Sequence, residues 1–133
     1  HKLHEAKVAG APEVTFWGSG RQRRQFLYVE DLAVAAVDIM HSPPFPEWGP
    51  LLNVTGHPAR RLDDVAESVA EVVGYSGRIR WDPTKAEGAP RKEITGGWAF
   101  PGLPTLLRVG VKQTYDWYIN RAVTVSGHHV ERT

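Results

Sequence analysis

The chain has 133 residues, of which 41% are hydrophobic and 23% are charged, and its formal net charge is +1. This length and composition predict one globular domain, and the near-neutral charge gives no general attraction to nucleic acid or to a membrane surface. The absence of cysteine excludes disulfides and thiolate catalysis and is typical of a cytoplasmic protein. No apolar run approaches the roughly 20 residues that span a bilayer. From the near-neutral charge and from this lack of a spanning segment, we expect neither a nucleic-acid nor a membrane partner.

Residues 1–7 have the pattern of the middle of a helix, and this helix is predicted to end near Gly10, because Gly after the last turn and Pro12 beyond it stop a helix. The sequence opens in the middle of this helical pattern, without Met or a cap, so we expect the chain to be a fragment of a longer protein. An alternating pattern predicts a strand over 13–17, and a short β-rich run predicts another over 26–29. Apolar residues at helical spacing then predict a helix over 31–40, favoured by acids at its N-terminus.

The rest of the sequence, from residue 42 on, predicts two more helices and two more short strands. The clearest amphipathic pattern covers residues 62–73 and is closed by Gly74. The remaining predicted segments are a Pro-rich connector at 42–46, strands at 51–54 and 78–81, a helix at 105–121 and a polar tail at 124–133.

The most informative stretch is the loop that follows the strand at 13–17. Gly18 and Gly20 let the backbone approach a ligand closely, and the arginines after them carry guanidinium groups that bind phosphate oxygens. Trp17 offers a flat apolar face to a base or a sugar. From its residues alone, the loop is predicted to bind an anionic ligand beside an aromatic wall.

The same residues carry a family resemblance. The runs at 14–20 and 24–33 resemble the extended short-chain dehydrogenase/reductases, the NAD-dependent epimerase/dehydratase family, and within them the GDP-L-fucose synthases. Further matches lie at 72–79, at 82–92 with the run Lys-x-acid-Gly-x-Pro-Arg-Lys, and at 112–118. The resemblance implies an NADP-dependent 3,5-epimerase and 4-reductase of GDP-4-keto-6-deoxymannose that works as a homodimer.

Two motifs of that family are absent from the sequence: the Gly-rich G-x-x-G-x-x-G turn that holds the dinucleotide, and the catalytic Tyr-x-x-x-Lys. We therefore expect residues 1–123 to be the C-terminal substrate-binding region, without the N-terminal Rossmann domain. The expected fold class is α/β, an incomplete extended short-chain dehydrogenase/reductase fold with few short strands and about four helices. We assign no catalytic residue, and we expect NADP to bind the full-length family but not this chain alone.

The resemblance assigns six residues to substrate binding. Arg24 is expected to contact the diphosphate, since a planar guanidinium matches two phosphate oxygens at once. Glu87 stands where the family has an Asp that accepts hydrogen bonds from ribose hydroxyls. The other four expected substrate contacts are Lys2, Trp17, Arg78 and Lys92.

Simpler interpretations stay open for these residues. Arg24, like Arg21 and Arg23, could be a solvated charge, Trp17 could be a packing residue, and Arg78 could pair with Asp82. The neighbouring histidines at 128–129 lack ligand spacing, so we expect no metal.

Three functions compete. The first is the GDP-sugar-binding part of a GDP-L-fucose synthase-like enzyme, which would need its missing Rossmann domain to act. The second is a non-catalytic interaction module, or pseudoenzyme remnant, that docks on a full-length paralogue through exposed apolar helix faces. The third is nucleic-acid binding through Arg21, Arg23 and Arg24, which the near-neutral net charge disfavours.

Overall fold

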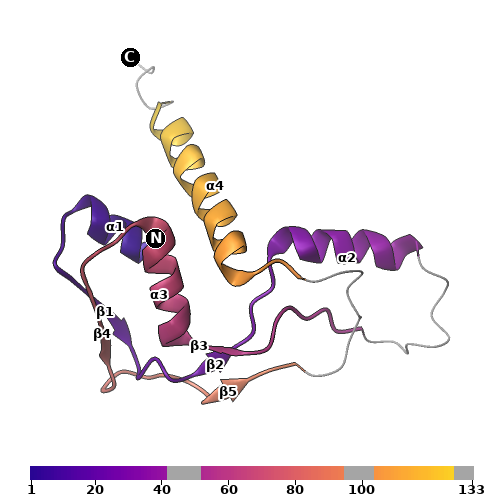
Figure 1. Ribbon diagram of the computed structural model, residues 1–133, viewed down its shortest axis with the longest axis horizontal. Helices are drawn as coiled ribbons and strands as arrows, with labels where there is room; N and C mark the ends of the chain where they lie inside the picture. The colour runs from indigo at the N-terminus through magenta and orange to yellow at the C-terminus, as the bar shows by residue number, and fades with distance from the viewer. Residues whose placement is uncertain (42–51, 95–103, 128–133) are drawn as a thin grey trace.

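The computed structural model describes residues 1–41, 52–94 and 104–127, with side chains described as far as residue 121. Four helices and five short strands alternate in these ranges (Figure 1), which confirms the predicted α/β class. In chain order the elements are α1 (Lys2–Val8), β1 (Glu13–Trp17), β2 (Arg23–Arg24), α2 (Val29–His41), β3 (Arg60–Arg61), α3 (Leu62–Val73), β4 (Arg78–Asp82), β5 (Arg91–Lys92) and α4 (Leu107–Gly127).

The strands form two small sheets. β1 and β4 pair in parallel over five residues, from Glu13 opposite Arg78 to Trp17 opposite Asp82. The second sheet has the order β3-β2-β5, with β2 antiparallel to β3 and parallel to β5. The loop 18–22 joins the two sheets, because it leaves β1 and enters β2.

The core lies where α1 and α3 cover the β1–β4 sheet. Its buried members are Leu3, Ala6, Val14, Ala70, Val73 and Tyr75. The phenol of Tyr75 donates a hydrogen bond to the carbonyl of Ala11 at 3.0 Å, so its polar end is satisfied inside this core. Tyr75 is the largest of these buried side chains, and Phe16 and Tyr115 pack against the cluster from outside while partly buried.

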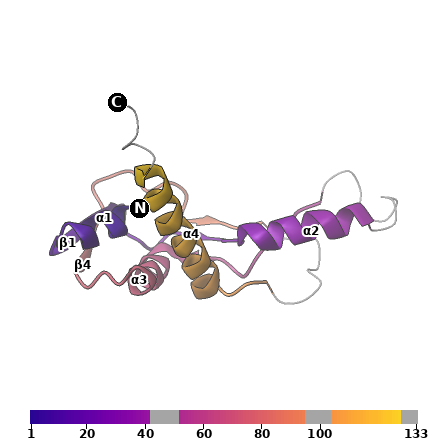
Figure 2. The same cartoon turned by 90° about the horizontal axis from the view of Figure 1, so that it is seen from above.

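α4 adds to this core through Tyr115, whereas α2 contributes no side chain to it. α4 packs against α3 on one side, and α2 lies beyond α4, away from the β1–β4 sheet (Figures 1 and 2). Asp31 ties the start of α2 to the segment before α4, since its carboxylate accepts from the backbone N–H and the hydroxyl of Thr105, each at 2.7 Å. Several apolar side chains of α2 stay more than half exposed: Val29, Val34, Val37 and Met40. Among the described helices, none combines the length and the apolar character needed to span a bilayer.

The longer predicted elements are confirmed. The helices appear at the predicted places, and the strand over 13–17 and the helix over 62–73 have the predicted bounds. The strand predicted over 26–29 is wrong, because residues 26–28 join no ladder and Val29 already begins α2. The strand predicted over 51–54 is wrong for 52–54, which are irregular. α4 continues to Gly127, into the predicted tail; residue 51, the connector at 42–46 and residues 128–133 lie outside the described residues.

Candidate anion-binding site

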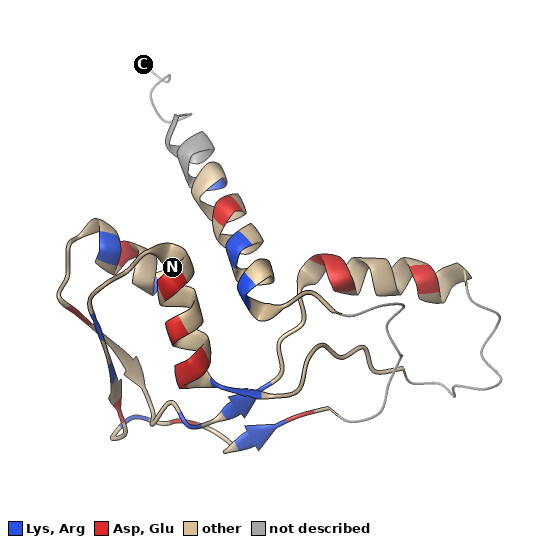
Figure 3. Ribbon diagram, in the orientation of Figure 1, with Lys and Arg blue, Asp and Glu red and all other residues tan. Residues whose placement is uncertain are grey.

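All six residues of the β3-β2-β5 sheet are basic. β2 contributes Arg23 and Arg24, and β3 and β5 contribute Arg60, Arg61, Arg91 and Lys92. Figure 3 shows this concentration of positive charge on the neighbouring strands below α3 and α4. Basic side chains at such spacing repel one another unless carboxylates or a bound anion compensate them. The sheet is therefore the natural place to look for an anionic ligand.

The register divides these residues into two rows, because directly opposite residues on neighbouring strands project from the same face. Arg23 lies opposite both Arg61 and Arg91, and these three form the carboxylate-paired row. Arg24 lies opposite both Arg60 and Lys92, and these three form the carboxylate-free row.

Two carboxylates compensate the carboxylate-paired row. Arg61 forms a forked pair with Asp63, in which Nε donates to Oδ1 at 2.9 Å and Nη2 donates to Oδ2. Arg91 donates from both Nε and Nη2 to the single oxygen Oε2 of Glu93, with Nε at 2.7 Å. The hydrogen bond from Arg61 holds the pKa of Asp63 below its ordinary value. The pKa of Glu93 is also lowered, first by the hydrogen bond from Arg91, then by the Ala59 N–H and by the charges of Arg91 and Arg23.

The carboxylate-free row has no such compensation. Within the part of the chain that the structure describes, Arg24, Arg60 and Lys92 take part in no ion pair. Toward the residues described in the structure, Arg24 donates one hydrogen bond, from Nη1 to the backbone carbonyl of Arg23 at 2.7 Å. Three cations on one face without an acidic partner can bind a group that carries two or more negative charges, and a diphosphate has that charge and size.

Glu87 is hydrogen-bonded to the loop 18–22, which leads into this sheet. Its Oε2 accepts from the backbone N–H of Ser19 at 2.7 Å and from Nε2 of the buried Gln22 at 2.9 Å. The hydrogen bonds from Ser19, and then the charge of Arg21, lower the pKa of Glu87. Glu87 thus holds the segment after β4 against the Gly18–Gly20 turn, in addition to the ligand contact predicted from the sequence.

The other predicted contacts lie on the β1–β4 sheet or beside it. Trp17 ends β1 and is 67% exposed, so it is available to a ligand. Arg78 starts β4, at the opposite end of this ladder and about 13 Å away along the strand. It does not pair with Asp82, whose carboxylate accepts from Thr84. Lys2 donates to the carbonyl of Thr15, with its Nζ 5.2 Å from the centre of the Phe16 ring.

The structure therefore brings together Arg24 and Lys92, and it does not bring Arg78 to them. It also adds Arg60, which the sequence analysis missed. The only sequence signal for Arg60 is a pair of arginines just before the acidic first turn of α3, and this pair resembles an ordinary helix start. Its place opposite Arg24 becomes visible only with the register of the sheet.

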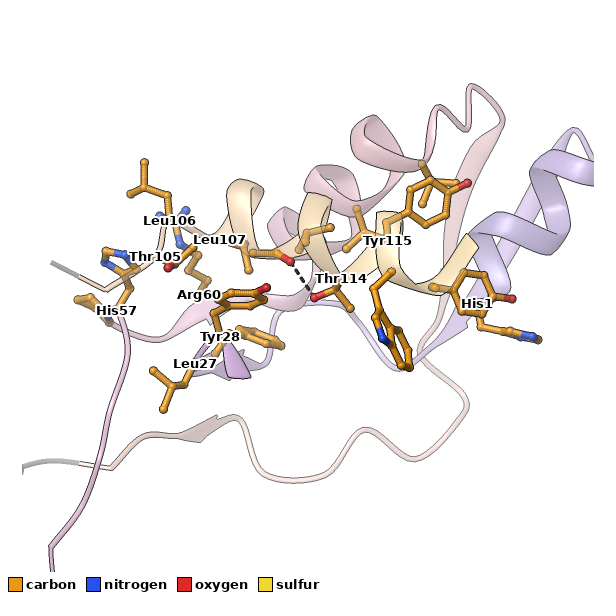
Figure 4. Close-up of a pocket in the computed structure, with 18 residues that line it drawn as sticks. His1, Leu27, Tyr28, His57, Arg60, Thr105, Leu106, Leu107, Thr114 and Tyr115 are labelled. Carbon is orange, nitrogen blue, oxygen red and sulfur yellow. Dashed lines mark hydrogen bonds between the residues drawn. The ribbon is translucent and has the colours of Figure 1, made fainter. Parts of the chain in front are cut away.

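A cavity of about 390 Å³ adjoins the carboxylate-free row. It lies between α4 and the segments that follow β2 and precede β3 (Figure 4), and its lining is mostly apolar and aromatic. Arg60 lies on its wall among Tyr28, Thr105 and Leu107 (Figure 4). The Tyr28 ring approaches α4 closely, since a Cβ added at Gly110 would lie 3.2 Å from its Cδ2. The cavity thus joins a charged wall to a flat apolar interior.

No group of three or more metal-ligating side chains comes together among the described residues. The histidines at 128–129 lie outside them.

Known proteins resemble this chain in sequence and in fold. The profile of the NAD dependent epimerase/dehydratase family matches residues 1–54. GDP-L-fucose synthase 1 of Arabidopsis thaliana is 41% identical over 124 residues, which cover 89% of this chain and 36% of that protein. GDP-L-fucose synthase of Escherichia coli is 35% identical over 130 residues, which cover 89% of this chain and 40% of that protein.

Among solved structures, a GDP-L-fucose synthetase from Naegleria fowleri superposes with a TM-score of 0.77 at 22% identity. The match covers 93% of this chain and 38% of that one, and a form of the same protein bound to NADP gives a TM-score of 0.73. The predicted resemblance and the incomplete fold are confirmed. The chain spans well under half of the length of the relatives it matches.

Proposed function

Because this chain is related over about nine-tenths of its length to the GDP-L-fucose synthases, we propose that it is the nucleotide-sugar-binding part of such an enzyme. The proposed ligand is a GDP-linked 4-keto-6-deoxy sugar, of which GDP-4-keto-6-deoxymannose is the expected member. The proposed reaction of the complete enzyme is epimerisation at C3 and C5 followed by reduction at C4.

The observation that carries this proposal is the register of β2 and β5. Arg24 and Lys92 lie 68 positions apart in the sequence, and both were expected at the ligand. β2 and β5 place them directly opposite each other, on a row without an acidic partner among the described residues. A planar guanidinium and a flexible ammonium can then bind neighbouring phosphate oxygens of one diphosphate.

In this proposal the chain binds and orients the substrate, and it does not supply the hydride. Reduction at C4 needs a nicotinamide and a proton donor, and these 133 residues contain neither the Gly-rich turn nor Tyr-x-x-x-Lys. We propose that NADP binds to a Rossmann domain outside this sequence, and that this domain also supplies the catalytic groups and the homodimer contacts. We therefore propose that the chain binds GDP-sugars without turning them over.

The experiment is a thermal-shift titration with GDP and GDP-mannose against UDP and dTDP. We expect the GDP compounds to raise the melting temperature more than the other two, since a ligand that binds only the folded state stabilises it by mass action. Arg24→Ala should abolish the shift, and Arg23→Ala, an equal charge change on the opposite face, should leave it. Equal shifts for all nucleotides, or no effect of Arg24→Ala, would refute the proposal.

The exposed apolar residues of α2 favour a second candidate function. Val34 and Val37 are 55% and 54% exposed, and Met40 is 81% exposed. Such a surface is typical of a segment that packs against another protein. The proposed occupant is a full-length paralogue with its own Rossmann domain. Light scattering with and without that paralogue tests this candidate, and a monomer that forms no complex contradicts it.

A further inference from the structure

We infer that Arg60 is a third phosphate-binding residue of this site, located where the carboxylate-free row meets the cavity beside α4. This inference rests on the proposed function and deepens it. Arg60 belongs to none of the motifs that carry the family resemblance, so only its place in the structure assigns it this role.

The position of Arg60 follows from the pairing of β2 with β3. Arg60 lies directly opposite Arg24, and Lys92 lies directly opposite Arg24 on the other side. Cβ atoms of directly opposite residues are about 5 Å apart, so the three side chains start within reach of one diphosphate. Arg24 is the middle member, with Arg60 and Lys92 beside it.

The charge of Arg60 is available for a ligand. It takes part in no ion pair within the described ranges, and its backbone neighbour Arg61 takes the nearby carboxylate of Asp63. Among the described residues, Arg61 therefore has an acidic partner and its neighbour Arg60 has none. A row of three cations without carboxylate partners is more favourable with an anion between them than without one.

The cavity determines on which side of the phosphates the organic group of the ligand would lie. Arg60 is the one member of the carboxylate-free row that also lines the cavity between Tyr28 and α4. A phosphate held by Arg60 has its ester oxygen beside an apolar and aromatic wall, which suits a flat ring or a sugar. The ligand that fits both features is a diphosphate carrying an organic group, rather than a free phosphate.

The test compares GDP and inorganic pyrophosphate by calorimetric titration against Arg60→Ala, with Arg61→Ala as its matched control. Both variants lose one positive charge from the same strand. We expect Arg60→Ala to weaken both ligands about tenfold, since a hydrogen bond to a charged group is lost, and Arg61→Ala to weaken them less than about twofold. Arg60→Lys should restore part of the affinity, because an ammonium keeps the charge without the fork.

The outcomes separate this inference from the proposed function. If Arg24→Ala abolishes GDP binding while Arg60→Ala binds like the unchanged protein, the inference is overturned and the proposed function stands. Equal losses for Arg60→Ala and Arg61→Ala would show that only net charge matters, which also overturns the inference. If the unchanged protein binds neither ligand, both fail. Urea unfolding of each variant checks that it is folded during the titration.

Discussion

Replacing Gly20 with Ala should destabilise the junction between the two sheets. Gly20 has a φ of +73°, and a Cβ added there would lie 2.6 Å from Cε2 of Trp81. The Gly20 carbonyl also accepts the N–H of Asp63 at 2.9 Å, at the start of α3. The substitution therefore strains the turn that leads into β2 and pushes on the helix that follows β3.

The expected magnitude has two parts. A non-glycine residue in the left-handed region costs about 1 kcal/mol or slightly more. Displacing the Trp81 ring adds about 1–3 kcal/mol, since this ring cannot swing aside like the end of a flexible chain and packs 5.4 Å from the Phe16 ring. The free energy of unfolding should fall by about 2–4 kcal/mol, a large part of the stability of a small domain.

Gly10→Ala is the matched control for this prediction. Gly10 has a similar φ of +62°, but nothing lies within 4 Å of a Cβ added there. Urea unfolding followed by tryptophan fluorescence should therefore show a loss of only about 1 kcal/mol for Gly10→Ala. Equal losses for the two variants would refute the conclusion that the contact between Gly20 and Trp81 determines the junction.

Two further predictions concern the core and the pH dependence of stability. Tyr75→Phe leaves the carbonyl of Ala11 without its 3.0 Å donor, so the free energy of unfolding should fall by about 1 kcal/mol; an unchanged urea midpoint would contradict the role of this hydrogen bond. Asp63, Glu87 and Glu93 have pKa values below the ordinary 3.8 for Asp and 4.5 for Glu. Their contribution to stability is present above those ordinary values and is lost as the pH falls through the lowered ones. Melting temperatures should therefore drop below about pH 4.5, and Glu87→Gln should flatten the drop; a variant with the unchanged pH profile would count against the Ser19–Glu87 contact.

The helices and the strands β1 and β4 could be predicted because their signals are periodic and local, whereas the parallel pairing of these two strands depends on contacts between distant segments. The helix over 62–73 has apolar residues at helical spacing and ends at Gly74, and the strand over 13–17 alternates. The three strands of the basic sheet could not be predicted, because each has two residues and arginine has no strong preference for strands. The apolar run at 26–29 gave a strand signal, but residues 26–28 face the cavity beside α4 and Val29 enters α2.

The candidate site was predictable only where family motifs reach it. The motifs pointed to Arg24 and Lys92, but their position opposite each other depends on contacts between segments distant in the sequence. Arg60 gave no usable signal for the same reason. The substrate-binding assignments stay predictions for all six residues: Lys2, Trp17, Arg24, Arg78, Glu87 and Lys92. The cytoplasmic location and the absence of a nucleic-acid partner also stay predictions.

A crystal structure of the chain soaked with GDP would show where the diphosphate binds. We predict diphosphate density along the carboxylate-free row, with phosphate oxygens about 2.7–3.2 Å from nitrogen atoms of Arg24 and Lys92. Density for the diphosphate beside Arg61 and Arg91 instead, or at Arg78, would contradict it. An empty row at a GDP concentration that saturates binding in solution would contradict it equally.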